Sequence, residues 1–101
     1  MLNIQKFIDS INAGDYNYAY SKLDDTFRTN NFKDVSGFKD YITKNFYTRN
    51  SIKYMQFTNE GTTYIYKVQI TDANNSDAVP VEKTIIMQLK DGTDFVMSFD
   101  I

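Results

Sequence analysis

The chain has 101 residues, a formal net charge of −2, and neither cysteine nor histidine. This length corresponds to a single domain, 1–101, and eight Phe and eight Tyr are enough for a packed core. The two missing residue types exclude disulfides, thiolate nucleophiles, imidazole bases and nearly every zinc or transition-metal site. We therefore expect neither a metal nor a cofactor.

Charge is unevenly distributed along the chain. Five basic and two acidic residues give segment 33–53 a charge of +3, whereas seven acidic and three basic residues give segment 54–101 a charge of −4. The basic residues of the middle segment are Lys33, Lys39, Lys44, Arg49 and Lys53. They fall far short of the clustered basic face typical of nucleic-acid binding, so we expect no nucleic-acid partner.

Membrane-spanning segments are not predicted, because no apolar run reaches the length of about 18 residues that a span requires. Met1 leads straight into an amphipathic segment without the apolar core of a signal peptide. We expect any export signal or anchor to lie outside this sequence.

Two helices joined by a sharp corner are predicted at the start of the chain. Apolar residues recur at helical spacing in 4–11 and again in 16–23; they are Ile4, Phe7, Ile8, Ile11, Tyr16, Ala19, Tyr20 and Leu23. Between them, Gly14 suits the left-handed position after a helix, and Asp15 can cap the next helix. We expect the second helix to end near Phe27.

A third helix is predicted after a polar, Asn-rich loop at 24–31. Phe32 is expected in the core, and Asp34 is a suitable N-cap. One face of the helix, which should end near Asn45, carries Val35, Phe38, Tyr41 and Ile42.

From Ile52 onward the apolar period changes to two, which predicts strands at 52–58, 62–71, 81–89 and 94–101. The expected inner face consists of Tyr64, Tyr66, Val68, Ile70, Val81, Ile85, Met87, Leu89, Phe95, Met97, Phe99 and Ile101. Either alternate set of the first strand can face inward. The order of elements predicts an α+β fold, with three N-terminal helices packed on the concave face of a curved four-stranded antiparallel sheet.

One stretch resembles a known superfamily. The segment Phe7–Tyr20, with its Asn-Ala-Gly-Asp corner and its Ala-Tyr pair, is followed by Phe38–Ile42, and both resemble the opening of nuclear transport factor 2-like, cystatin-like cone domains. The resemblance implies a cone in which the helical corner covers a bent sheet. Among such domains the chain most resembles small bacterial envelope modules, including those of lipoproteins, penicillin-binding-protein accessory regions and conjugation-channel subunits.

Some enzymes of this superfamily, steroid isomerases and polyketide cyclases, place tyrosines and carboxylates in the cavity of the cone. The resemblance therefore implies a small-molecule-binding or cyclase/isomerase-like enzyme as an alternative function. Five tyrosines are candidate cavity-lining residues: Tyr16, Tyr20, Tyr41, Tyr64 and Tyr66. Asp40 and Asp100 are the available carboxylates, but no diagnostic motif is present, and we assign no catalytic residue. Tyrosines at such positions more often fill a core, with their hydroxyls reaching water or backbone.

A calcium loop is the remaining metal-site candidate. Asp72, Asn74 and Ser76 match its first alternating oxygen ligands, but Asp77 stands where the loop needs Gly and Lys83 where it needs Glu. We interpret the segment as a turn.

The outer face of the sheet is the predicted interaction surface. If the inner set faces the helices, Ile65, Ile86 and Val96 point outward among polar neighbours. Isolated apolar residues on strands are also ordinary. The predicted interface residues are Ile65, Lys67, Ile86, Gln88 and Val96, and the expected partner is another protein or a second copy.

We expect a non-catalytic protein-interaction or assembly module. The resemblance implies an extracytoplasmic domain of a larger bacterial envelope or transfer-apparatus protein, although a cytoplasmic location is also compatible with the sequence.

Overall fold

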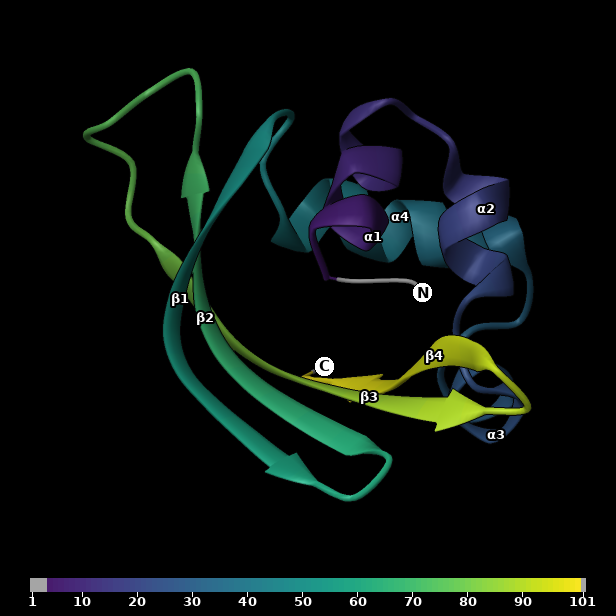
Figure 1. Cartoon of the computed structure of the whole chain (residues 1–101). Coiled ribbons are helices and arrows are strands. Elements are labelled where there is room, and N and C mark those ends of the chain that lie inside the picture. The colour runs from purple at the N-terminus through teal and green to yellow at the C-terminus, as the bar shows by residue number, and fades with distance from the viewer. Residues whose placement is uncertain (1–3, 101) are drawn as a thin grey trace.

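The computed structural model describes residues 4–100, which form four helices and one four-stranded sheet (Figure 1). The elements are α1 (Ile4–Asn12), α2 (Tyr16–Ser21), α3 (Asp25–Asn31), α4 (Val35–Asn45), β1 (Asn50–Glu60), β2 (Thr63–Asp72), β3 (Val81–Lys90) and β4 (Thr93–Phe99). The strands form an antiparallel meander in the order β1-β2-β3-β4. The sheet is strongly curved, and α1, α2 and α4 lie on its concave side. The predicted α+β fold with a curved antiparallel sheet is confirmed.

The core lies between the helices and the concave face of the sheet. The predicted apolar face of α1 is buried, with Ile4, Phe7, Ile8 and Ile11 at most 3% exposed. Phe99 of β4 is at the centre of an aromatic cluster. Its ring centroid lies 5.0–6.5 Å from those of Phe7, Phe27, Phe32, Tyr41 and Phe46. One side chain therefore joins α1, α3 and α4 to the sheet.

The helical corner is confirmed, but α2 is shorter than predicted. Gly14 has φ +76°, and the Asp15 carboxylate accepts a hydrogen bond from the Tyr18 N–H at 3.2 Å. The helix ends at Ser21 because the following segment pairs with β4. There, the Val96 N–H donates to the Lys22 carbonyl at 2.7 Å, and the Asp24 N–H donates to the Val96 carbonyl at 2.8 Å.

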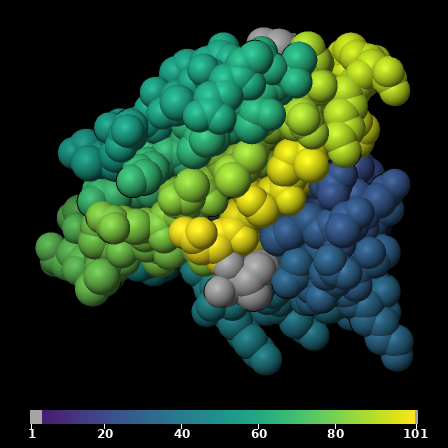
Figure 2. All heavy atoms as spheres, turned by 90° about the horizontal axis from the view of Figure 1, so that it is seen from below, coloured from purple at the N-terminus to yellow at the C-terminus, as the bar shows by residue number. Residues whose placement is uncertain are grey.

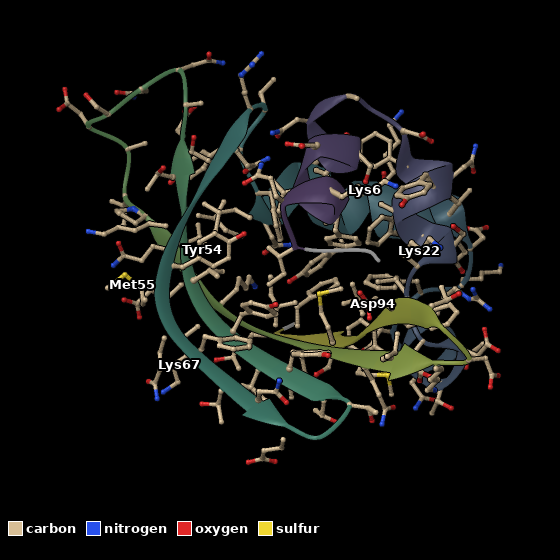
Figure 3. The ribbon with its side chains drawn as sticks, viewed as in Figure 1. Lys6, Lys22, Tyr54, Met55, Lys67 and Asp94 are labelled. Carbon is tan, nitrogen blue, oxygen red and sulfur yellow. The ribbon has the colours of Figure 1, made fainter. Side chains whose placement is uncertain are left out.

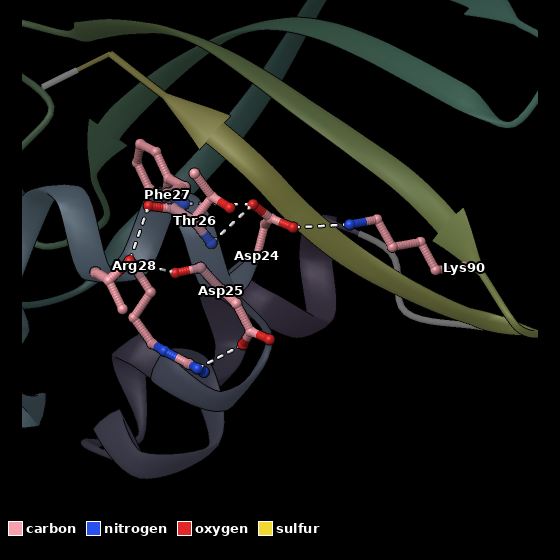
Figure 4. A network of polar contacts seen from close by, with 7 residues as sticks. Asp24, Asp25, Thr26, Phe27, Arg28 and Lys90 are labelled. Carbon is pink, nitrogen blue, oxygen red and sulfur yellow. Dashed lines mark hydrogen bonds and ion pairs between the residues drawn. The ribbon is translucent and has the colours of Figure 1, made fainter.

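The predicted loop at 24–31 is wrong, because α3 occupies most of it (Figure 4). Asp24 explains this helix: its carboxylate accepts from the N–H groups of Thr26 and Phe27 and pairs with Lys90 at 2.8 Å. The Phe27 ring then packs edge-on against Phe99, with centroids 5.0 Å apart. A polar sequence thus forms a fourth helix because its cap and one aromatic side chain bind it to the sheet.

Two β-bulges decide which side chains face the helices. At Met55 the register shifts, so that Tyr54 pairs with Val68 but Phe57 pairs with Tyr66, and both Tyr54 and Phe57 are concave. This resolves the alternatives left open for the first strand.

The second register shift, at Met97, reverses the predicted faces of part of β4. Val96 pairs with Met87 and is fully buried, so the prediction that it points outward is wrong. Phe95 pairs with Gln88 on the outer face, where the prediction placed it inward. Phe99 is buried as predicted, and Ile101 lies outside the described residues.

The two edges of the sheet differ. Segment 22–24 bonds to the edge of β4, and α3 lies beside that strand (Figure 2). At β1, Asn12 bonds to Asn50 at the start of the strand. Within residues 4–100, no other segment is hydrogen-bonded to the outer edge of β1 beyond that point. The sheet therefore has one closed edge and one open edge.

Replacing Gly14 with Val tests the corner. A Cβ atom there would meet nothing within 4 Å, so the expected loss of about 1–2 kcal/mol comes from holding a β-branched residue at positive φ. Thermal and urea unfolding measure the change. Gly37→Ala in α4 is the control, because its Cβ would make only an ordinary 3.7 Å contact, and this variant should gain up to about 1 kcal/mol. Equal stability of Gly14→Val and wild type would contradict the positive-φ corner.

The Asp24 cap predicts a pH dependence of stability. The hydrogen bond from Lys90, with those from Phe27 and Thr26, lowers the pKa of Asp24 below its ordinary value of 3.8. The stabilisation is therefore complete above that value, where the carboxylate is charged in both states, and is lost as the pH falls through the lower folded pKa. Urea unfolding between pH 6 and 2 should show that the free energy of unfolding falls more with acidification in wild type than in Asp24→Asn. If the free energy of unfolding of the two proteins changes in parallel with pH, the stabilising role of the Asp24 carboxylate is contradicted.

Candidate functional site

The five tyrosines predicted to line a cavity lie in four separate places. Tyr16 is half-buried beside α4, with the Lys39 ammonium 5.7 Å from its ring centroid. Tyr20 packs on Phe38 at 5.7 Å. Tyr41 belongs to the Phe99 cluster, and Tyr64 and Tyr66 lie together on β2. The structure does not bring the five into one site.

Tyr41 and Asp100 hold the end of β4 in place. The Tyr41 hydroxyl donates to the Asp100 carbonyl at 2.9 Å and accepts from the Lys83 ammonium at 3.0 Å. The Asp100 carboxylate accepts from the Thr84 N–H at 3.1 Å. These contacts are structural, and the other predicted carboxylate, Asp40, is exposed.

Two of the surface hollows reach the volume of roughly 300 Å³ at which small-molecule sites begin. The first, of about 360 Å³, is on the outer side of the sheet and is lined by Met55, Lys67, Val68, Glu82, Lys83, Thr84 and Asp100. The second, of about 300 Å³, lies between the ends of α1 and α4. Tyr16 lines the second, and none of the other four tyrosines lines either hollow. Neither hollow therefore has the expected convergence of tyrosines and carboxylates.

A group of four aromatic rings, here called the aromatic lip, lies on the concave face of the β1–β2 hairpin. Its members are Tyr54, Phe57, Tyr64 and Tyr66. The Phe57 ring centroid lies 5.0 Å from that of Tyr66 and 6.2 Å from that of Tyr64, and Tyr54 lies 6.1 Å from Tyr66. Tyr54 is 51% exposed and Phe57 is 53% exposed.

The aromatic lip results from the bulge at Met55, which places Tyr54 and Phe57 on one face although they are three residues apart. Figure 3 shows Tyr54 on the concave side of β1 and Met55 on the outer side. Partial burial raises the pKa of both Tyr54 and Tyr66. The charge of Asp9 on α1 adds to the effect at Tyr54, and the charge of Asp94 adds to it at Tyr66.

Asp94 is a second feature that the sequence did not indicate. It is only 3% exposed, and its Oδ1 atom has no hydrogen-bond partner among the described residues. Simple alternation back from Phe99 would turn Asp94 outward, but the bulge at Met97 puts it on the concave face with Val96. A buried unpaired carboxylate is costly, so its position calls for a physical reason.

The predicted outer-face interface is smaller than expected. Ile65 and Ile86 are direct cross-strand neighbours and are half-buried, with Lys67 exposed beside them. Gln88 is half-buried on the same face, whereas Val96 is in the core. The outer face therefore has two of its three expected apolar members.

The calcium-loop segment forms a turn, in which the Asp72 carboxylate accepts from the Asn74 N–H at 2.9 Å. Among residues 4–100, no group of three or more acidic side chains is arranged to hold a metal ion. No helix in the same range is long and apolar enough to cross a membrane.

Comparison with known proteins gives no family model that matches the chain, and no significantly similar curated protein or solved structure.

Replacing Asp94 with Asn tests its unpaired state. Removing a buried negative charge without changing the side-chain size should raise the free energy of unfolding by about 1 kcal/mol at pH 7. Asp91→Asn is the matched control, because Asp91 is exposed in the β3–β4 turn at φ 52°, which Asn tolerates. Urea unfolding measures both variants. A clear loss of stability in Asp94→Asn would mean that the carboxylate has a stabilising partner.

Proposed function

We propose that this chain is a non-catalytic protein-interaction module that docks a segment of a partner protein on its aromatic lip. One observation carries the proposal: of the four large apolar side chains exposed in residues 4–100, Tyr54 and Phe57 lie together on the concave face of β1, and Met55 lies between them on the outer side. Exposed apolar groups of this kind mark interaction surfaces more often than isolated residues do, and aromatic residues are enriched at such surfaces.

The edge position of β1 supports this proposal. A strand without an outer neighbour offers unpaired N–H and C=O groups to an extended segment, which can add to the sheet as a further strand. Segment 22–24 already takes this position at β4. At β1 the aromatic lip adjoins the open edge, so backbone hydrogen bonds and ring contacts can act on the same partner segment.

The outer face remains a second candidate surface for a partner or a second copy. Ile65 and Ile86 face each other there, flanked by Lys67 and Gln88. Both isoleucines are half-buried within the sheet surface, so they offer less apolar area than Tyr54 and Phe57. We therefore place the main contact on the aromatic lip.

The wider assignment is also a proposal: a cone domain of the nuclear transport factor 2-like superfamily, forming an extracytoplasmic part of a larger bacterial envelope or transfer-apparatus protein. The helical corner at Gly14 and the helices on the concave side of a curved sheet support the cone. The location rests on the resemblance alone. The dispersed tyrosines give no support to the cyclase or isomerase-like alternative.

Selection from a displayed library of random peptides tests the docking proposal. Peptides enriched on the wild-type chain should bind the double variant Tyr54→Ser/Phe57→Ser at least about ten-fold more weakly, a loss of about 1.4 kcal/mol, because the ring surface is removed. Val79→Ser is the matched control, since Val79 is 78% exposed and lies in the β2–β3 connection, away from the aromatic lip. Titration of purified domain with each peptide gives the affinities.

The variant Ile86→Lys distinguishes binding at the outer face of the sheet from binding at the aromatic lip. Binding that survives in the lip variant but fails in Ile86→Lys would place the contact on the outer face. If no peptide is enriched and the wild type also sediments as a monomer at high concentration, the interaction proposal is contradicted.

A further inference from the structure

The lysines of β1 and β2 are directed away from the aromatic lip. Lys53 pairs across the sheet with Gln69, and Lys67 pairs with Thr84, which places both lysines on the outer face. Figure 3 shows Lys67 on the outer side of the sheet, opposite Tyr54. The carboxylates of Asp9 on α1 and Asp94 on β4 act on the lip tyrosines from the concave side. Lys83 of β3 pairs with Val68 on this face, but its ammonium is held by the Tyr41 hydroxyl and the Asp100 carbonyl. The lip therefore lies in a negative environment.

The other tyrosines of the core region already bind cations through their rings. Tyr16, Tyr18, Tyr20 and Tyr41 each have a Lys or Arg side chain 5.4–5.7 Å from the ring centroid. No such contact is found at Tyr54, Phe57, Tyr64 or Tyr66 among the described residues. The aromatic lip thus presents the ring surface that attracts cations, and no cation of residues 4–100 lies over it.

Asp94 supplies a negative charge on the same concave face as the rings. Tyr64 pairs with Met87, and Met87 pairs with Val96, so the three side chains form one row across the concave face. Asp94 pairs with Leu89, one row beyond Tyr64 and two rows from Tyr66 on the same face, and it is two strands from β2, a separation of about 10 Å across the strands. Because Asp94 is buried and its Oδ1 atom is unpaired, solvent and counterions screen its field only weakly.

We propose that the aromatic lip receives a Lys or Arg side chain of the docked partner segment, held over the rings of Tyr54, Phe57 and Tyr66 and attracted by the buried charge of Asp94. The inference rests on the proposed function and names the chemistry of the partner. Asp94 is a positioning residue in this arrangement: it acts through its field and needs no direct contact with the cation. The cost of burying Asp94 without a partner is then offset when the cation binds.

Two blocked peptides test the inference, Ac-Thr-Val-Lys-Val-Thr-NH2 and its uncharged analogue with norleucine in place of lysine. Their β-branched residues favour an extended conformation, and they differ only in the terminal charge. Amide chemical shifts of the ¹⁵N-labelled chain, followed during titration, give both the affinity and the location of binding. The lysine peptide should shift the amides of β1 and β2 around Tyr54, Phe57 and Tyr66 and bind at least about five-fold more tightly than the norleucine peptide.

Variants of Asp94 and Asp91 distinguish an effect of the Asp94 charge on binding from an effect of altered folding. Asp94→Asn should weaken binding of the lysine peptide about three- to ten-fold and leave the affinity of the norleucine peptide unchanged, because only the field of the Asp94 charge is lost. Asp91→Asn, the exposed control, should change neither affinity. Amide spectra and melting curves of each variant confirm that it is folded, and Asp94→Glu, which retains the charge, should bind the lysine peptide better than Asp94→Asn.

Equal affinities for the two peptides at the aromatic lip would overturn the inference while leaving the docking proposal standing. An unchanged lysine affinity in folded Asp94→Asn would also overturn the role of Asp94. If the lysine peptide leaves the amides of the lip unshifted, the inference is overturned, and the library selection then decides independently whether the chain docks peptides at all.

Discussion

The two bulges in the sheet are the constraint on which the candidate site depends. At Met55 the extra residue places Tyr54 and Phe57 on the same face, and at Met97 it turns Val96 and Asp94 toward the helices. A shift of one residue moves every following side chain to the other face of a strand. The aromatic lip and the buried carboxylate are therefore both consequences of two local irregularities, and both lie on the concave side.

The packing around Phe99 explains why one edge of the sheet is closed and the other is open. Phe27 and Phe32 pack against the Phe99 ring, and this packing holds α3 beside β4. Segment 22–24 then bonds along the β4 edge and removes it from solvent. Among residues 4–100, no comparable aromatic contact connects the helices to the half of β1 nearest the β1–β2 turn, where the rings contact only β2. The open edge and the exposed rings thus occur together because the helical layer ends before it reaches the hairpin.

Several features of the concave face lower stability unless something binds there. Exposed Tyr54 and Phe57 keep apolar surface in water, and Asp94 is charged or polar in an apolar setting without a partner for Oδ1. Elsewhere the chain satisfies its polar groups: the N-termini of three helices are capped by Asp15, Asp24 and Asp34. Exposed apolar side chains and unpaired buried polar atoms are expected where a protein binds its partner. The difference between the concave face and the capped helices therefore supports both proposals.

The sequence by itself determined the α+β class, the helical corner at Gly14, the meander of four strands and the core faces of α1, α4, β2 and β3, because these depend on short-range periodicity, caps and turns. Tertiary structure decided the rest. Residues 24–31 became helical because Asp24, which caps this helix, pairs with Lys90 and because Phe27 packs against Phe99. These partners are 66 and 72 residues apart in the sequence, so only the fold brings them together. Bulges have no reliable local signature, so the inward turn of Val96 and Asp94 followed from how β4 pairs with β3 and with segment 22–24.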